Sequence, residues 1–508
     1  MPTLQGKLEI ADFDQIIFKN DTVQLHKDII ERVQNSFDFL KEFSENKTIY
    51  GVNTGFGPMA QYKIKDDERI QLQYNLIRSH SSGTGNPIPA QYVRAAMLAR
   101  LNTLSLGNSG VHPSVIKLMS ELLNKNIIPL IYEHGGVGAS GDLVQLAHLA
   151  LVLIGEGEVF YKGERKNTDE VFKIENLQPI KVELREGLAL MNGTSVMTGI
   201  GVVNVLYTRR IMDWMIKASS AINEIVMAYD DHLSFELNQT KKHEGQRKIA
   251  EMMRAHLNDS NLTRKREHHL YNGAKDVVVF DEKVQEYYSL RCVPQILGPV
   301  LDTLNNVEKI LIEEVNSAND NPIVDVENRN VYHGGNFHGD YVSLEMDKLK
   351  IVVAKMTMLS ERQLNYLLNS KLNDILPPFV NLGKLGLNFG MQGVQFTATS
   401  TTAESQMLSN PMYVHSIPNN NDNQDIVSMG TNAALITKKV IENAFEVVAI
   451  ELITIVQAIE YLNVQDSVSS ETKKMYDEIR AIVPVFKEDV VMYPFVNSVK
   501  EFLMDCSK

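Results

Sequence analysis

The sequence has little cysteine, no long apolar run and no excess of positive charge. Its two cysteines, Cys292 and Cys506, are too few for a disulfide framework or a zinc cluster. The longest purely apolar runs, such as residues 149–154, are too short to cross a bilayer. The formal net charge of -13 argues against nucleic acid or an anionic membrane as the main partner. We therefore expect no metal site, no nucleic acid and no membrane among its partners.

The beginning of the sequence also lacks the pattern of a secretion signal. Residues 1–18 are polar and acidic, whereas a signal peptide begins with positive charge and continues with an apolar stretch. With 44% hydrophobic and 22% charged residues, the 508-residue chain has the composition of an ordinary globular protein. These features predict a cytoplasmic enzyme or binding protein.

Long helical segments with almost no proline fill the second part of the chain. They are residues 199–236, 295–315, 341–368 and 426–462. Helices so rich in Leu, Ile, Val and Met must pack against one another, within the chain or across subunits. Shorter helices are expected at residues 23–43, 70–77, 90–105 and 112–125, with a modest β signature at 156–188. We predict a mainly α-helical fold, in which an N-terminal globular domain (residues 1–196) precedes a bundle of long helices (residues 197–508).

The most unusual stretch is GGVGASGD at residues 135–142. Three of its glycines follow the G-x-G-x-x-G pattern of a dinucleotide-binding turn, and residues 127–132 could be the preceding strand. Such a domain needs several alternating strands and helices, and only one plausible strand precedes these glycines. An NAD-binding dehydrogenase is therefore kept as the alternative from a different class of enzyme.

The same stretch permits a second chemistry. In a tight bend the nitrogen of Gly141 can attack the carbonyl carbon of Ala139 with loss of water, and Ser140 can then lose a second water. The product is a 4-methylidene-imidazol-5-one (MIO) ring, a strong electrophile made from the backbone. The flanking glycines suit such a bend because they tolerate strained backbone angles. The competing interpretation is a plain turn with Asp142 near a helix N-terminus.

Irregular polar stretches interrupt the helices elsewhere. They are residues 50–58, 78–85, 190–194, 285–292, 333–339 and 421–425. Taken singly, each can be an ordinary loop or helix cap. Taken together with residues 135–142, they carry more aromatic, amide, histidine and arginine side chains than connecting loops require, which indicates a site.

The set resembles the ammonia-lyases and aminomutases that use the MIO ring, the family of histidine, phenylalanine and tyrosine ammonia-lyases. The resemblance lies in the motifs YGVNTGFG at 50–57, GASGDL at 138–143, NGT at 192–194, YSLRC at 288–292, DNP at 320–322 and GNFH at 335–338. It extends from residue 50 to about residue 429 and looks closest to bacterial tyrosine ammonia-lyases. It implies an MIO ring made from Ala139, Ser140 and Gly141, with no external cofactor. It also implies a homotetramer whose active sites take residues from more than one subunit.

The resemblance implies roles for individual residues. An electrophile that captures the amino group of an amino acid turns this group into a better leaving group. Tyr50 would be the base for the Cβ proton, and Asn192 would polarise the ring's oxygen. Arg291 would clamp the substrate carboxylate with its bidentate guanidinium. The remaining residues implied in the site are Tyr288 and Gln285 on the amino-group side and Phe337 beside the ring.

Two features bear on the substrate, an aromatic amino acid. Ser79 and His80 occupy the loop that faces the substrate side chain in this family, and histidine ammonia-lyases commonly carry Ser-His there. In the pair Asn423-Gln424, however, Gln424 stands where histidine ammonia-lyases usually place a glutamate. His80 without that carboxylate suits a neutral ring with a polar tip, so we expect conversion of L-tyrosine to p-coumarate and ammonia. Histidine ammonia-lyase and, less so, tyrosine aminomutase are the alternatives within the family.

Overall fold

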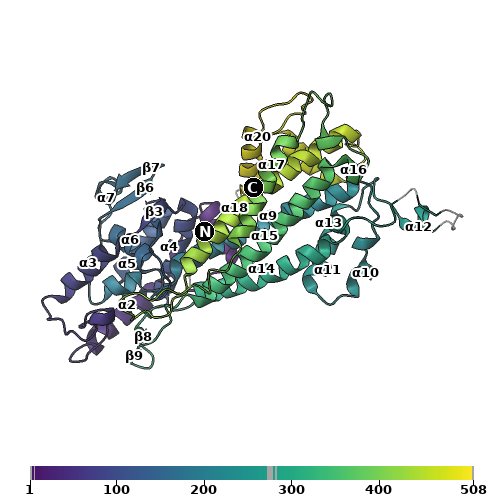
Figure 1. The fold of residues 1–508 in the computed structure, drawn as a ribbon. Coiled ribbons are helices and arrows are strands. Elements are labelled where there is room, and N and C mark those ends of the chain that lie inside the picture. Colours follow the sequence, from purple (N-terminus) through teal and green to yellow (C-terminus); the bar gives the residue numbers. More distant parts are fainter. Residues whose placement is uncertain (1–2, 5, 272–277, 281–282, 506–508) are drawn as a thin grey trace.

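The computed structural model describes residues 3–4, 6–271, 278–280 and 283–505, so Cys506 lies outside the described residues. The molecule is elongated, with the N-terminal part at one end and the long helices running toward the other (Figure 1). Most elements are helices, and the few strands are short. The predicted fold class, a mainly α-helical protein with a bundle of long helices, is confirmed.

Four long helices form the bundle: α9 (Ser195–Ile225), α14 (Val293–Val315), α15 (Asp340–Leu368) and α18 (Gly430–Leu462). Helix α18 packs along α15 and α9, and α14 packs on α15. Every residue from 447 to 459 of α18 is buried. Because this stretch is covered on all of its faces, α18 occupies the inside of the bundle.

Two of these helices differ from their predicted bounds. The helix expected over residues 199–236 ends at Ile225, and the one expected from residue 426 begins at Gly430. Met227 and Met429 have φ angles of +54° and +52°. Since a residue in the left-handed region cannot continue a right-handed helix, these two residues set the ends.

The N-terminal part consists of shorter helices. They are α2 (Lys27–Phe43), α3 (Arg69–His80), α4 (Ala90–Ser105), α5 (Pro113–Asn124), α6 (Leu143–Leu153), α7 (Thr168–Glu175) and α8 (Glu186–Met191). Helix α4 packs against α9 and is buried over residues 92–105, so it joins this part to the bundle. The predicted boundary between residues 196 and 197 falls in the first turn of α9, and the division into two domains stays a prediction.

The strands form four small sheets. These pair β1 (Thr3–Leu4) with β2 (Gln24–Leu25), β3 (Thr84–Pro87) with β5 (Tyr132–His134), β4 (Ile128–Pro129) with β6 (Glu158–Tyr161) and β7 (Glu164–Asn167), and β8 (Ile323–Asp325) with β9 (Asn330–Tyr332). The hairpin β6–β7 confirms the strand expected before Gly163. The strand expected at residues 182–184 is wrong, because Leu184 has a φ of +45° and the chain enters α8. The described residues contain no doubly wound parallel sheet, which the dehydrogenase alternative requires.

The remaining helices are short or lie on the outside of the bundle. They are α1 (Ile10–Phe13), α10 (Phe235–Gln239), α11 (Glu244–His256), α12 (Arg266–His269), α13 (Tyr288–Arg291), α16 (Ser370–Asn373), α17 (Gln392–Leu408), α19 (Ser470–Arg480) and α20 (Tyr493–Met504), with single turns of other helix types at Asp14–Phe18, Gly57–Met59, Asp231–Leu233 and Pro378–Val380. Helices α17 and α20 pack on α18, and α11 packs on α14. Among the described helices, none combines the length and hydropathy needed to span a bilayer.

Candidate active site

A cavity of about 500 Å³ lies in the N-terminal part, between helix α3, helix α8 and the loop of residues 135–142. It collects side chains from segments that are far apart in the sequence. Of the residues predicted for the site, it is lined by Tyr50, His80, Ser140, Asn192, Phe337, Asn423 and Gln424. Most of the predicted site is therefore assembled within one chain.

Main-chain groups and one serine hydroxyl hold the glycine-rich loop on both sides. The carbonyl oxygen of Gly138 accepts hydrogen bonds from Gly339 N at 3.2 Å and from Ser428 Oγ at 2.9 Å. On the other side, Asp142 N donates to Gly193 O at 2.8 Å. The loop thus has a fixed conformation before any chemistry takes place on it.

The backbone at Gly141 fits the closure of an MIO ring. Its φ is +70°, and a Cβ atom at this position would lie 2.0 Å from Gly193 O. Only glycine can therefore occupy the position. Because its α-carbon carries no side chain, nothing next to the nitrogen hinders attack on Ala139. Ala139 is almost fully buried, which keeps the reacting carbonyl away from bulk water.

Two amide side chains hold Ser140. Asn192 Nδ2 donates to the carbonyl oxygen of Ser140 at 3.1 Å, and this is the carbonyl oxygen that the ring would retain. Gln424 Nε2 donates to Ser140 Oγ at 2.9 Å, the hydroxyl that would leave as water. A donor at the carbonyl oxygen would favour loss of the Cα proton of Ser140, and a donor at the hydroxyl would favour its departure as water, so the residues present fit the group.

Asp142, directly after the triad, is fully buried. Its carboxylate accepts hydrogen bonds from Val196 N at 2.8 Å and Met197 N at 2.9 Å, in the first turn of α9, and from the hydroxyl of Thr431. Desolvation raises the pKa of Asp142 to about 6, and these hydrogen bonds oppose the rise. The carboxylate therefore joins the loop to the N-terminus of α9, where its charge is favoured.

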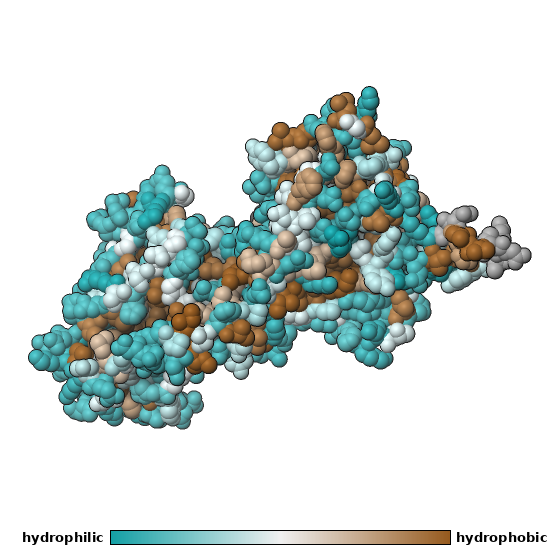
Figure 2. Space-filling view, viewed as in Figure 1, coloured by the Kyte–Doolittle hydropathy of each residue, from teal (hydrophilic) through white to brown (hydrophobic). Residues whose placement is uncertain are grey.

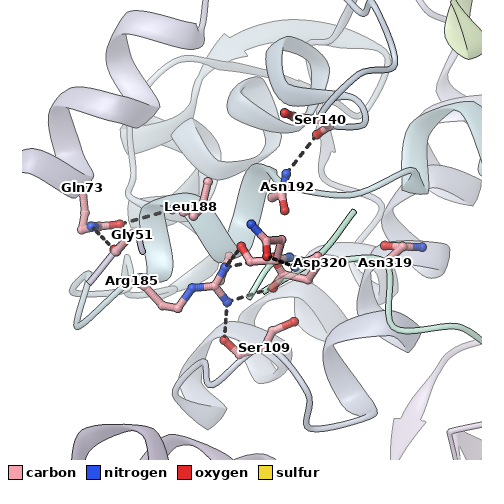
Figure 3. A network of polar contacts seen from close by, with 12 residues as sticks. Gly51, Gln73, Ser109, Ser140, Arg185, Leu188, Asn192, Asn319 and Asp320 are labelled. Atoms are coloured by element: carbon pink, nitrogen blue, oxygen red, sulfur yellow. Dashed lines mark hydrogen bonds and ion pairs between the residues drawn. The ribbon is translucent and has the colours of Figure 1, made fainter. Parts of the chain in front are cut away.

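A buried polar network supports Asn192 from below (Figure 3). The fully buried guanidinium of Arg100 donates to Asn192 O at 2.9 Å, and desolvation lowers the pKa of Arg100 to about 10. Next to it, Arg185 and Asp320 form a buried ion pair at 2.9 Å. Breaking such a pair leaves an uncompensated charge, so the network resists rearrangement of the segment that carries Asn192.

Tyr50 lies at the start of the glycine-rich loop after α2. Its phenolic oxygen accepts a hydrogen bond from Gly57 N at 3.1 Å, and its ring lies edge-on to Phe56. The loop thus provides both Tyr50 and a main-chain donor to its phenolic oxygen.

His80 ends helix α3 and lies at the wall of the cavity. Its Nδ1 lies 3.0 Å from Leu76 O and 3.0 Å from Ser79 Oγ. Because a carbonyl oxygen can only accept, we assign the proton of the neutral ring to Nδ1, which leaves Nε2 as an acceptor. Desolvation lowers the pKa of His80 and so favours this neutral form.

The other predicted binding residues lie elsewhere in the chain. Gln285, Tyr288 and Arg291 line a separate cavity of about 610 Å³ beside α13. In Figure 1, α13 lies near the end of the bundle that is remote from α3 and α6. Arg291 lies over the ring of Tyr288 at 4.8 Å and donates to Gln285 Oε1. One chain therefore keeps these residues together but does not bring them to the cavity that contains Tyr50.

Several residues at the cavity were not expected from the sequence as parts of the site. Asn321 and Leu143 belong to motifs that had been identified, so their neighbours indicated them. Leu188 lines the cavity from α8, and the fully buried Gln73 on α3 accepts a hydrogen bond from the main-chain N–H of Leu188. Nothing in the local pattern distinguishes these two residues from ordinary core positions.

Comparison with known proteins places these observations in a family. A model of the aromatic amino acid lyase family matches residues 8–481. A histidine ammonia-lyase from Staphylococcus saprophyticus is 38% identical over 98% of this chain and 97% of its own length. A tyrosine 2,3-aminomutase from Chondromyces crocatus is 37% identical over 98% of this chain and 95% of its own length. The solved structure of tyrosine aminomutase from Streptomyces globisporus has a TM-score of 0.95 and 34% identity, over 99% of this chain and 97% of that one.

The family match includes both the cavity with Tyr50 and the segment with Arg291. The resemblance to this family, predicted from short motifs, is thereby confirmed, while the finer likeness to bacterial tyrosine ammonia-lyases stays a prediction. The chain belongs to the aromatic amino acid lyase family and is an enzyme of the carbon–nitrogen lyase class.

Proposed function

We propose that the enzyme converts L-tyrosine to p-coumarate and ammonia. The observation that carries this proposal is that Nε2 of His80 is an acceptor at the cavity wall. None of the described residues that line this cavity is a charged Asp, Glu, Lys or Arg. A phenol can donate a hydrogen bond to this nitrogen, whereas the ring of phenylalanine would leave it unpaired. Gln424 offers an amide where a carboxylate would hold an imidazole, which makes histidine the poorer substrate.

We propose that Ala139, Ser140 and Gly141 form the MIO ring. When formed, the ring supplies an electrophile that captures the amino group and makes it a better leaving group. Asn192 donates to the oxygen of Ser140 and stabilises the negative charge that develops there. Tyr50 removes the proton from Cβ, and the N–H of Gly57 in its own loop donates a hydrogen bond to its phenolic oxygen.

Other residues of the cavity orient the substrate in this proposal. Phe337 packs beside the ring and keeps water from it, and Asn423 lines the wall next to Gln424. The aromatic side chain of the substrate then points to His80. Its carboxylate still needs a cation, and none is present among the described lining residues.

We further propose that a second copy of the chain supplies Gln285, Tyr288 and Arg291, in a homotetramer. Arg291 offers the bidentate fork that suits a carboxylate. The bundle exposes large apolar side chains that an interface would cover: Tyr341, Leu344 and Ile351 on α15, and Phe396 and Met407 on α17. Figure 2 shows hydrophobic surface over the long helices, which a monomer in water would not favour.

A tyrosine 2,3-aminomutase is one alternative, because a relative of that name is 37% identical to this chain. Its reaction also begins with removal of ammonia, which then returns to Cβ. The difference lies in how long ammonia and the product stay in the closed site. A histidine ammonia-lyase is the first alternative that the sequence suggested, supported by a relative at 38% identity and opposed by Gln424.

The test is to incubate the purified enzyme separately with L-tyrosine, L-phenylalanine and L-histidine. Absorbance follows p-coumarate, cinnamate and urocanate, and chromatography detects β-tyrosine. We expect p-coumarate to form fastest, cinnamate more slowly and urocanate slowest. Faster formation of urocanate would assign histidine as the substrate, and β-tyrosine as the main product would assign the aminomutase reaction.

A further inference from the structure

One buried glutamine joins the two segments that carry the base and the ring's donor. Gln73 lies on α3, two turns before His80, and is fully buried. Its Nε2 donates to Gly51 O at 3.1 Å, and its Oε1 accepts from Leu188 N at 3.2 Å (Figure 3). A single amide thus uses its donor side for one segment and its acceptor side for the other.

Each of these two segments leads directly to a residue of the site. Gly51 follows Tyr50, the proposed base. Leu188 lies in α8, and its carbonyl oxygen accepts from Asn192 N at 2.9 Å. Asn192 in turn donates to Ser140 O at 3.1 Å. A hydrogen-bonded path from Gly51, next to Tyr50, to the carbonyl oxygen of Ser140 therefore runs through the side chain of Gln73.

The packing around this amide leaves no room for the segments to slide. Gly51 has a φ of +78°, and a Cβ atom there would lie 2.6 Å from Leu188 Cδ2. A Cβ atom at Gly187 would lie 2.7 Å from the main-chain oxygen of Gln73. The loop, α3 and α8 are thus in contact through glycines on two sides of the same glutamine.

We propose that Gln73 is a positioning residue that sets the separation between Tyr50 and Asn192, and with it the placement of the base relative to the ring. This inference rests on the function proposed above. A displacement of about 1 Å in a reacting group can cost about 10²-fold in rate, so a hydrogen-bonded spacer between base and electrophile has a direct effect on turnover.

Two substitutions separate positioning from packing. Gln73→Leu removes both hydrogen bonds, whereas a protonated Gln73→Glu side chain keeps one donor and one acceptor, like the native amide. Ionisation of this buried carboxyl removes the donor to Gly51 O. We therefore expect the kcat of Gln73→Glu, divided by that of the parent enzyme, to be near one at low pH and to fall as the pH rises.

For Gln73→Leu we expect kcat to fall by about 10²-fold at every pH, with KM changed by less than about threefold. The matched control is Gln457→Leu. Gln457 is a buried glutamine in α18 that donates to Phe486 O at 3.0 Å and accepts from Arg480 at 2.9 Å, away from the cavity. Its substitution should leave kcat within about threefold of the parent value.

Hydrogen exchange provides a readout that needs no substrate. Gln73→Leu should speed amide exchange in residues 51–57 and 186–192, and Gln457→Leu should not.

If the parent enzyme converts none of the three amino acids, the proposed function fails, while exchange still decides the role of Gln73. An unchanged kcat in Gln73→Leu, or an equal loss in Gln457→Leu, overturns the positioning role. If Gln73→Leu does not fold, a pH-independent ratio for Gln73→Glu overturns it instead.

Discussion

The side-chain amide of Asn192 lies 3.1 Å from the carbonyl oxygen of Ser140 and donates a hydrogen bond to it. This oxygen is the one that an MIO ring keeps, because closure of the ring expels the oxygen of Ala139. If the proposed ring forms, the donor is therefore in place before closure and faces the same oxygen afterwards. Because donors of this kind are already oriented, no energy is needed to reorient them when charge develops on the oxygen.

Replacing Ser140 with Ala should abolish turnover without unfolding the protein, because no hydroxyl remains to leave as water. The intact mass of the parent should be two waters below the encoded mass, and its ultraviolet band from the ring should disappear with borohydride. Ser317→Ala is the control, since Ser317 is exposed and its hydroxyl donates to Glu313 O in the last turn of α14. Active parent enzyme with an unmodified mass would refute the ring.

Replacing Tyr50 with Phe should remove the base and leave the electrophile. Loss of a general base costs about 10²–10⁴-fold, so elimination should fall by that factor. The ultraviolet band of the ring should stay, since Asn192 and Ser140 keep their hydrogen bond. If Tyr50→Phe eliminates ammonia at nearly the parent rate, the base is another residue, and Tyr288 is the next candidate.

Replacing His80 with Phe should shift preference from tyrosine to phenylalanine. The variant leaves the phenol without its acceptor, so the ratio of kcat/KM values for the two substrates should change by about ten- to a hundredfold. His80→Gln keeps an acceptor oxygen and serves as the control that should retain most of the preference. An unchanged ratio in His80→Phe would show that another group binds the phenol.

Co-expression of two inactive variants tests whether each site is shared between copies. Tyr50→Phe and Arg291→Ala chains should together regain activity, because random assembly gives about a quarter of the sites both native residues. The matched control combines Tyr50→Phe with Ser140→Ala, whose residues line the same cavity of one chain and should give no recovery. If the first pair of variants regains no activity, the Tyr50 and Arg291 that serve one active site belong to the same chain.

Glu451 predicts a pH dependence of stability. It is fully buried in α18, and desolvation raises its pKa from 4.5 to about 8, while a hydrogen bond from Ser360 opposes the rise. The folded state then holds a proton that the unfolded state has lost, so stability falls by about 1.4 kcal/mol per pH unit between pH 4.5 and 8. Glu451→Gln should remove this slope.

The measurement is the free energy of unfolding at several pH values in that window. The advantage of Glu451→Gln over the parent should grow as the pH rises and level off above pH 8. Glu327 is exposed, so Glu327→Gln should show no such growth and serves as the control. A constant difference between Glu451→Gln and the parent would mean that this carboxyl titrates normally.

The local sequence pattern was enough to predict much of the fold and to identify the family. The predicted helix at residues 90–105 is α4 with the same bounds, because Pro89 precedes it, good helix formers fill it and Gly107 follows it with a φ of +78°. The triad Ala139-Ser140-Gly141 and the other short motifs indicated the family because each needs particular residues at adjacent positions. Patterns failed where one residue adopts a left-handed φ, as at Met227 and Leu184, since surrounding contacts and not residue type impose that conformation.

Only the tertiary structure decided which of these residues meet. It places Asn192 on the oxygen of Ser140, assigns the proton of His80 to Nδ1 through Leu76 O, and keeps Arg291 in a cavity apart from the one with Tyr50. It also shows Gln73 between two segments of the site, at a position that the sequence presents as ordinary helix. The physical reason is that periodicity and motifs record interactions between near neighbours in the chain. Distances between remote segments result from the packing of the whole core, to which every helix contributes.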